Sequence, residues 1–387
     1  MNVLVINAGS SSLKFQVLEM PSGAVFLSGI VERIGLDQTQ FHYERQGVKK
    51  SELVSFINHK EALLAIATII QDLGRTIDTV AHRVVHGGEQ FSSTTFITKE
   101  VKAKISELSA LAPLHNPANL ACIEVSELVF PHSNQIAIFD TAFHQTIPEK
   151  AYRYAIPARF YELEKIRQYG FHGTSHKYVS QQAISHLGLK SSKIITIHLG
   201  NGCSMTAVKD GKSIDHSMGY GPINGLIMGT RSGDIDQAII FYMMDNLGYS
   251  SKEVQELLQK ESGMKGLTGF SDLREIEEQA LLGNKMCQLA LDMNAYRVKK
   301  VIGSYVAVLN GLDALVFTAG IGENSSFMRE LICQELDFFG ITIDSAINAI
   351  RSKEIRNVGT LDSRVPILVI PTNEELEMAE QAYELTK

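Results

Sequence analysis

The stretch VLVINAGSSSLKFQVL, residues 3–18, decides the expected fold. An apolar run from Val3 to Ile6 leads into a turn of Gly, Ala and Ser, and an alternating run follows from Leu13. This pattern predicts two strands joined by a turn of small residues. The turn also carries serine hydroxyls and the Lys14 ammonium, which are groups that can cradle phosphate oxygens. A serine-rich hairpin turn with a solvated lysine is the alternative interpretation.

A second stretch, KIITIHLGNGCSMTAVKDGKSI at residues 193–214, repeats this plan in the second half of the chain. It reads as strand, small-residue turn, strand and further turn, although sequence identity between the two stretches is low. Apolar residues at helical spacing, as in residues 60–74, predict helices between the strands, and this mixture is typical of an α/β domain. The repeat predicts two related domains that each present a phosphate-contacting hairpin to a shared cleft.

The composition is that of an ordinary globular protein. The chain has 387 residues, 44% hydrophobic and 20% charged, which is enough for two or three domains. The formal net charge of −7 argues against nucleic acid as the main partner. Four scattered cysteines without a CxxC motif indicate neither a disulfide framework nor a zinc site. The apolar runs are too short for a membrane helix or a signal peptide, so we expect a cytoplasmic protein.

Two further glycine-rich segments follow predicted strands. HLGNGCS (198–204) lies in the second repeat, and FTAGIGENS (317–325) leads from a strand into a second glycine-rich turn. Gly320 and Gly322 would let the backbone approach a ligand closely, and GENS offers a helix start whose N–H groups favour anions. A tight hairpin for the first segment and ordinary helix capping for the second are the alternatives.

Four single residues have settings that favour chemistry. Arg83 in HRVVHGGE and Arg231 in GLIMGTRSGDID adjoin glycine-rich turns, where a guanidinium can bind carboxylate or phosphoryl oxygens or form a surface ion pair. Asp140 ends the apolar run IAIF, where a carboxylate can bind magnesium, act as a base, or cap a helix or turn. His172 in YGFHGTSH either donates to a developing oxyanion or is a buried structural histidine.

Two side chains with oxygen atoms complete the candidates. Asn7 follows the first apolar run, and Glu374 lies in IPTNEE at another strand end. Such oxygens can help to hold a hydrated magnesium ion. From the residues alone, we prefer to interpret Glu374 as an N-terminal helix residue that the helix dipole stabilises.

Nine segments in this order resemble the acetate kinase family, which includes acetate and propionate kinases: NAGSSSLKF, HRVVHGGE, PLHNP, FDTAFHQTIP, YGFHGTSH, HLGNG, MGTRSGDID, FTAGIGENS and IPTNEE. The resemblance extends from Met1 to about Glu375. It implies the duplicated α/β fold of actin, sugar kinases and Hsp70 chaperones, a ribonuclease H-like fold with two domains around a nucleotide cleft. The expected domains are residues 1–145 and 146–373, and a C-terminal helix at about 374–387 can pack back onto the first domain.

The resemblance also implies a reaction. It is the reversible, direct in-line transfer of a phosphoryl group from ATP to acetate, giving acetyl phosphate and ADP. Mg²⁺ would be the cofactor, with Mn²⁺ as a substitute, and the enzyme would be a homodimer with neither nucleic acid nor a membrane as partner. The alternatives are a propionate or other short-chain carboxylate kinase, a sugar kinase, and a non-catalytic actin-like nucleotide switch.

The motifs that match the family imply a set of site residues in this chain. The expected catalytic residues are Asp140, His172, Arg231 and Arg83, and the expected metal ligands are Asn7 and Glu374. The expected substrate-binding residues are Arg83, Val85, Leu114, Phe171 and Pro222, the last four forming an apolar pocket for the substrate methyl group. The expected nucleotide-binding residues are Lys14, His198, Leu199, Gly200, Asn201, Gly202, Asp272, Leu273, Arg274, Gly320, Ile321, Gly322, Glu323 and Asn324.

The sequence departs from the expected family pattern in a few places. Residues 215–226 read DHSMGYGPINGL, where the family more often reads DTSMG-x-TPLEGL. The differing residues are His216, Gly221, Ile223 and Asn224 here, Cys203 after HLGNG, and Gln237 after GDID. Because Pro222 adjoins the expected pocket, these differences bear on the size of the substrate more than on the type of reaction.

Overall fold

The opening stretch forms the predicted antiparallel hairpin. The computed structural model of the chain describes residues 1–9, 11–36, 38–45, 47–113 and 115–387. Strand β1 (Asn2–Ala8) pairs with β2 (Ser12–Glu19) along its whole length. Leu4 and Ile6 of β1 belong to one buried cluster, and Val3 and Val5 to another, because successive side chains point to opposite faces. A strand that is apolar on both faces must therefore be covered on both sides.

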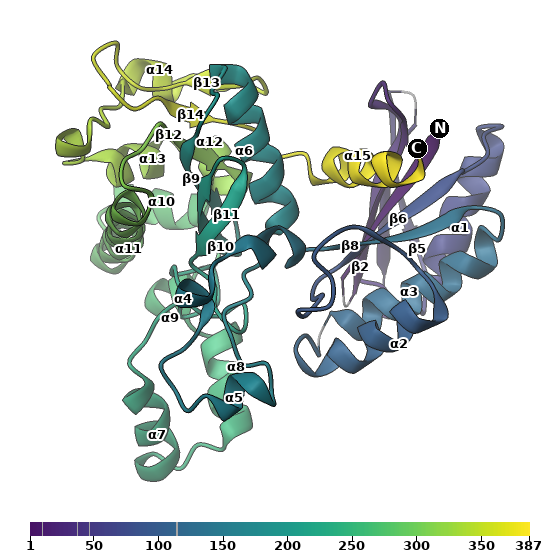
Figure 1. The fold of residues 1–387 in the computed structure, drawn as a ribbon, viewed down its shortest axis with the longest axis horizontal. Coiled ribbons are helices and arrows are strands. Elements are labelled where there is room, and N and C mark those ends of the chain that lie inside the picture. The colour runs from purple at the N-terminus through teal and green to yellow at the C-terminus, as the bar shows by residue number, and fades with distance from the viewer. Residues whose placement is uncertain (10, 37, 46, 114) are drawn as a thin grey trace. The chain divides into compact units, whose positions relative to one another are not determined.

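The chain folds as two units, residues Met1–Gln145 with Asn373–Lys387, and residues Thr146–Thr372. The strands of the first unit after β2 are β3 (Ala24–Glu32), β4 (Thr39–Arg45), β5 (Val48–Val54), β6 (Thr79–Val84), β7 (Thr95–Phe96) and β8 (Asn134–Phe139). Its helices are α1 (His59–Asp72), α2 (Lys99–Glu107), α3 (Asn116–Val129) and α15 (Glu374–Thr386). Figure 1 labels β2, β5, β6, β8 and these helices.

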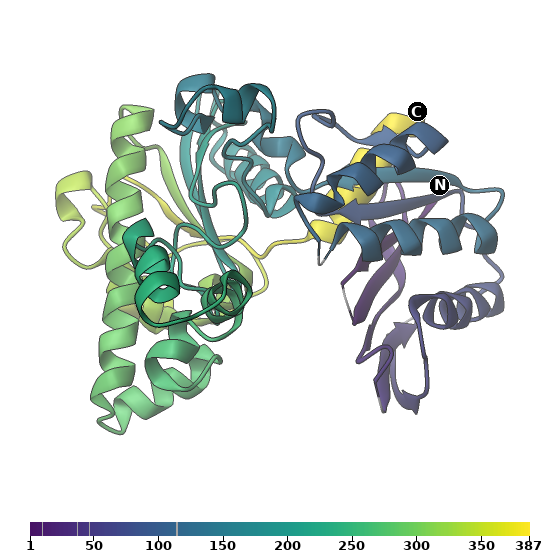
Figure 2. The same cartoon turned by 90° about the horizontal axis from the view of Figure 1, so that it is seen from below.

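Helices cover both faces of the sheet in the first unit, whose strand order is β5-β4-β3-β2-β1-β6-β8-β7. Helix α1 and Cys122 of α3 pack with Leu4 and Ile6 on one face. On the other face Met378 and Ala379 of α15 pack with the alternate residues of β1. The two termini of the chain thus lie close together (Figures 1 and 2), and the Thr386 hydroxyl is 3.4 Å from the sulfur of Met1.

The second unit contains a six-stranded sheet with the order β11-β10-β9-β12-β14-β13. Its strands are β9 (Lys193–Leu199), β10 (Cys203–Lys209), β11 (Lys212–His216), β12 (Ala314–Thr318), β13 (Arg356–Asn357) and β14 (Ile367–Val369). Its helices are α4 (Glu149–Tyr152), α5 (Arg159–Glu162), α6 (Gly173–Leu187), α7 (Gln237–Asn246), α8 (Ser251–Lys260), α9 (Gly263–Thr268), α10 (Leu273–Leu281), α11 (Lys285–Leu309), α12 (Ala319–Asn324), α13 (Ser326–Cys333) and α14 (Ser345–Ala349).

The two sheets share one five-stranded arrangement. In the first unit β3-β2-β1 are antiparallel neighbours, and β6 and β8 continue the sheet parallel to β1. In the second unit β11-β10-β9 are antiparallel, and β12 and β14 continue parallel to β9. This repeated topology confirms the duplicated α/β fold. It also places the residues that follow β6, β8 and β12 at the carboxyl ends of parallel strands, where α/β proteins build their sites.

One local prediction was wrong. Residues 319–324 form helix α12 and not a glycine-rich turn. The helix is held because the Glu323 carboxylate accepts from the backbone N–H of Ala319 at 2.9 Å and of Thr372 at 3.1 Å. The expected helix start in GENS is confirmed, since the Ser325 hydroxyl caps α13 by accepting from the Met328 N–H at 3.0 Å. Within the described residues, every helix is too short or too polar to traverse a bilayer.

Candidate active site

An arginine–aspartate pair lies at the carboxyl ends of β6 and β8 in the first unit. Arg83 is in β6, and Asp140 directly follows β8, the parallel neighbour of β6. The Arg83 Nε donates to both carboxylate oxygens of Asp140, at 2.9 and 3.0 Å, and Nη2 donates to one of them as well. The Asp140 N–H donates to the Val84 carbonyl at 3.0 Å, which fixes the backbone there. Sheet register therefore brings together two of the predicted catalytic residues.

Residues of the first hairpin and of α15 surround this pair. The Asn7 Oδ1 accepts from the Arg83 Nη1 at 3.0 Å. Lys14, opposite Asn7 in the hairpin, forms a 2.5 Å ion pair with Glu375, so its ammonium faces the N-terminus of α15. Burial lowers the pKa of the Arg83 guanidinium, but the charge and hydrogen bond of Asp140 and the charges of Glu374 and Glu375 together outweigh this effect. The net shift is upward, so the arginine is firmly cationic.

Glu374, the first residue of α15, has a different electrostatic setting. Burial raises the pKa of its carboxyl group, and the Asp140 and Glu375 charges raise it further against the opposing effect of Arg83 and Lys14. In the part of the chain that the structure describes, its carboxylate has no hydrogen-bond or ion-pair partner. An acidic group in this state is suited to a divalent cation, which would supply the missing positive charge.

The oxygen donors near Arg83 suit a divalent metal that is not held by protein side chains alone. Among the described residues no three His, Cys, Asp or Glu side chains are grouped closely enough to hold a metal ion. Mg²⁺ commonly takes one or two protein oxygens and completes its shell with water and substrate phosphates. The Glu374 carboxylate and the Asn7 amide offer oxygen atoms of that kind.

Two asparagines of α3 fix the loop that follows Arg83. The Asn119 amide accepts from the Val85 N–H at 3.2 Å and donates to the Ala8 carbonyl at 2.8 Å, which ties this loop to the end of β1. The Asn116 amide bonds both the N–H and the carbonyl of His86, at 3.1 and 3.0 Å. The Val85 side chain is buried. Leu114, the predicted neighbour of Val85 in the substrate pocket, lies outside the described residues.

The second unit positions His172 at the start of α6. His172 has a left-handed backbone conformation, φ +56°, which is unusual for a residue with a side chain. Its Nδ1 is 2.9 Å from the Ser204 hydroxyl, and the same hydroxyl is 2.7 Å from Nε2 of His176. The His172 ring also stacks on His198 with ring centroids 4.3 Å apart. The imidazole is thus fixed on two sides.

Gly202 lets His172 and Arg231 approach the same point. A β-carbon added to Gly202 would be 3.3 Å from Nε2 of His172 and 3.9 Å from Nη1 of Arg231. Burial lowers the pKa of the Arg231 guanidinium, with the nearby Cys203 acting in the opposite direction. The Arg231 Nη1 donates to the Pro222 carbonyl at 3.0 Å. The structure therefore brings His172, Gly202, Arg231 and Pro222 together, and Pro222 contributes a backbone oxygen to the cluster.

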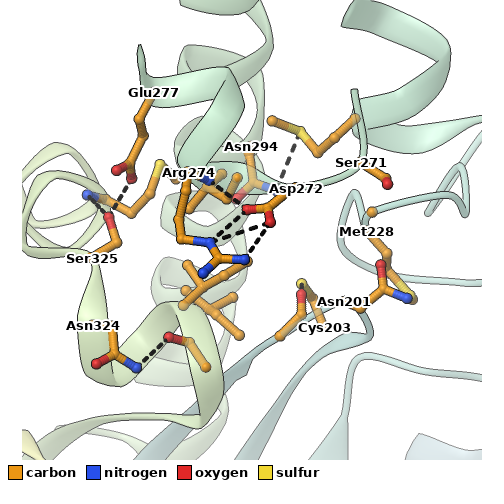
Figure 3. Close-up of a pocket in the computed structure, with 18 of the residues that line it drawn as sticks. Asn201, Cys203, Met228, Ser271, Asp272, Arg274, Glu277, Asn294, Asn324 and Ser325 are labelled. Carbon is orange, nitrogen blue, oxygen red and sulfur yellow. Dashed lines mark hydrogen bonds and ion pairs between the residues drawn. The ribbon is translucent and has the colours of Figure 1, made fainter. Parts of the chain in front are cut away.

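A cavity of about 810 Å³ lies beside this cluster in the second unit. Figure 3 shows that polar side chains from several separate segments surround it. Nine of the predicted nucleotide-binding residues line it: Leu199, Gly200, Asn201, Asp272, Leu273, Arg274, Gly320, Ile321 and Asn324. Four others of the prediction, His198, Gly202, Gly322 and Glu323, are not in its lining, and Lys14 belongs to the other unit.

Several lining residues were not predicted from the sequence. They are Cys203, Ile227, Met228, Gly229, Met264, Ser271, Glu277, Asn294, Ser325, Met328 and Arg351. Asn294 on α11 donates to the Ile227 carbonyl at 3.0 Å, and an asparagine on the apolar face of a helix is a signal that could have marked it. The Glu277 carboxylate accepts from the Ser325 hydroxyl, a contact between distant segments that sequence patterns do not reveal.

The duplicated fold, the charged cluster at the strand ends of the first unit and the cavity of the second unit are each features of kinases of the actin and sugar-kinase fold class. The sequence model of the acetokinase family matches residues 2–380. The chain is 59% identical to an acetate kinase of Flavobacterium johnsoniae over 392 residues, covering 100% of this chain and 99% of that one. It is 50% identical to an acetate kinase of Thermotoga petrophila over 401 residues, covering 100% and 99%.

Solved structures agree. The crystal structure of Porphyromonas gingivalis acetate kinase matches with a TM-score of 0.94 at 43% identity, covering 100% of both chains. A propionate kinase from Francisella tularensis matches with a TM-score of 0.94 at 41% identity, covering 99% of both chains. The chain therefore belongs to the acetokinase family, whose members are phosphotransferases with a carboxyl group as acceptor and use ATP or ADP with a divalent metal.

Proposed function

We propose that this enzyme catalyses the reversible, Mg²⁺-dependent transfer of a phosphoryl group from ATP to acetate. The observation that carries the proposal is the Arg83–Asp140 pair with Asn7 beside it, because this is a preorganised cation at a strand end. Arg83 would bind the carboxylate of the acid, and Val85 would contact its methyl group. Asn7 and Glu374 would hold Mg²⁺, which neutralises phosphate charge when it is bound.

The chemistry needs alignment and charge cancellation more than covalent help. A carboxylate oxygen of the acid forms a bond to the γ-phosphorus while the bond from that phosphorus to the β,γ-bridging oxygen breaks, and its electron pair leaves with ADP. His172 and Arg231 would donate to the equatorial phosphoryl oxygens as charge spreads over them. The cavity of about 810 Å³ would hold the nucleoside, with Asp272, Leu273 and Arg274 at its wall. Lys14 would contact the phosphates.

The test is an ATP-dependent hydroxamate assay, in which an acyl phosphate reacts with hydroxylamine. Acetate with ATP and Mg²⁺ should give product, and the reverse reaction should make ATP from acetyl phosphate and ADP. A sugar kinase would give no hydroxylamine-reactive product. A non-catalytic nucleotide switch would bind ATP without turnover that depends on a carboxylate, and either result would overturn the proposal.

Propionate is the second candidate acid, because the propionate kinase from Francisella tularensis matches this chain as well as the Porphyromonas gingivalis acetate kinase does by TM-score. One methylene changes specificity by only about 1–3 kcal/mol, so both acids are expected to react. Comparing kcat/KM for acetate, propionate and butyrate decides between them. A clear preference for a longer acid would make this a propionate or butyrate kinase.

We also propose that the enzyme is a homodimer in the cytoplasm. Helix α7 supports the dimer, because in the described chain none of its residues is buried although Ile239, Phe241 and Tyr242 are apolar or aromatic. A second copy would cover this face. Light scattering should show a dimer for the parent and for Leu361→Asp, whose side chain is fully exposed in a loop, and monomer for Phe241→Asp. A monomeric parent would contradict the proposal.

A further inference from the structure

A buried histidine contacts the segment that carries His172. His216 is the last residue of β11 and pairs with Thr206 of β10. It is one of the positions at which the sequence departs from the expected family pattern. Its side chain is 3% exposed, and its ring meets His176 edge to face with centroids 5.2 Å apart. The ring is therefore held inside the second unit.

The two ring nitrogens of His216 have different partners. The backbone N–H of Phe171 donates to Nε2 at 3.1 Å, and Nδ1 is 2.8 Å from the Thr206 hydroxyl. A backbone N–H can only donate, so Nε2 must present its lone pair. The neutral imidazole then has its proton on Nδ1 and donates it to Thr206. This assignment follows from the chemistry of the partners.

His216 and the residues after it hold the backbone that leads into His172. The His216 carbonyl accepts from the Gln168 side-chain amide, and the Gly219 carbonyl accepts from the Tyr169 N–H at 3.0 Å. Together with the bond to Phe171, these contacts fix residues 168–171 along 216–219. The next residue, His172, has the left-handed conformation, which persists only where its surroundings determine it.

We propose that His216 is a positioning residue for phosphoryl transfer. Its Nε2 lone pair holds the Phe171 amide and thereby aims the His172 imidazole that follows. Displacing a catalytic group by about 1 Å can lower a rate by on the order of a hundredfold, so a contact one residue away from His172 is close enough to matter. The inference rests on the proposed function, in which His172 donates to the transferred group.

Two amide variants separate the contacts of His216. The oxygen of His216→Gln is four bonds from Cα, as Nε2 is, and can accept from the Phe171 N–H. The amide of His216→Asn is three bonds from Cα, as Nδ1 is, and can reach only Thr206. We expect His216→Asn to lower kcat by on the order of ten- to a hundredfold with little change in the KM for ATP, and His216→Gln to stay close to the parent.

Three results would overturn the inference. The first is a His216→Asn variant that keeps the kcat of the parent, and the second is a His216→Gln variant whose kcat falls as far as that of His216→Asn. The third is a His216→Asn variant in which kcat, the KM for ATP and thermal stability all change together. A long-range ¹H–¹⁵N spectrum of the parent, with the His216 signal assigned from its loss in His216→Gln, tests the tautomer without depending on the Asn variant. A proton on Nε2 contradicts the inference. A parent that makes no acyl phosphate refutes the proposed function instead, and the spectrum still tests the contact.

Discussion

The Arg83 guanidinium donates through Nε to both oxygens of Asp140, whose side chain is almost completely buried. The two residues lie 57 positions apart in the sequence and meet because β6 and β8 are parallel neighbours. The hydrogen bonds to Asp140 therefore orient the Arg83 guanidinium before any substrate binds. If either side chain were removed, the other would be left as an unpaired charge in a largely buried site, which would destabilise the fold.

Arg83→Ala should therefore affect both catalysis and folding. Loss of the cation should raise the KM for the acid, and the buried Asp140 charge left behind should cost about 3–5 kcal/mol of unfolding free energy. The double variant Arg83→Ala/Asp140→Ala should be more stable than Arg83→Ala, because the unpaired charge is gone. Urea unfolding of the parent, both single variants and the double variant measures this coupling. A double variant less stable than Arg83→Ala would contradict the prediction that the unpaired Asp140 charge destabilises the fold.

Glu374→Gln should stabilise the metal-free protein at neutral pH. Because the pKa of Glu374 is raised in the folded state, ionising it costs stability as the pH rises through that pKa. The gain from Gln should thus be present at pH 7 and should vanish as the pH falls toward 4.5, the ordinary pKa of a glutamate. Thermal unfolding across this pH range measures it. In the same scans Mg²⁺ should raise the Tm of the parent more than that of the variant, and equal shifts would argue against Glu374 as a ligand.

Gly202→Ala should lower kcat. The new β-carbon would be 3.2 Å from Cε1 of His172 and 3.3 Å from its Nε2, which is tighter than ordinary contact, so the imidazole must shift. A displacement of a few tenths of an ångström should cost about tenfold in kcat. Gly303→Ala is the matched control, because Gly303 lies in α11 with open space around its β-carbon position. Steady-state kinetics that match the parent in both variants would contradict this geometry.

Gly320→Val should weaken ATP binding without disturbing the fold. Gly320 lines the cavity, and no atom lies within 4 Å of its β-carbon position, so the valine side chain would point into open space. The KM for ATP should rise several-fold or more while the KM for acetate changes little, since accommodating the added isopropyl group should cost about 1–3 kcal/mol. Gly303→Val makes the same change in another helix and should leave both constants alone. An unchanged KM for ATP would mean that the nucleoside binds elsewhere.

Much of the fold could be predicted from the sequence, because its signals are local. Apolar runs and alternation in residues 3–18 and 193–214 predict strands, and small residues between them predict turns. The presence of glycine alone predicts turns less reliably. Residues 319–324 contain two glycines and still form a helix, because Glu323 binds the N–H groups of Ala319 and Thr372. The contact with Ala319 lies within the helix, but the contact with Thr372 joins residues 49 positions apart and leaves no local pattern.

The sequence by itself determined the strand pattern, the repeat, and the motifs that name Arg83, Asp140, His172 and Arg231. Only the tertiary structure decided which of these residues are partners. Sheet register joins Arg83 to Asp140, and the packing of Gly202 brings His172 beside Arg231. The physical reason is that periodicity records which face of an element is apolar, whereas a hydrogen bond between distant segments depends on how those elements pack. The lone pair that His216 offers to the Phe171 amide is of this second kind.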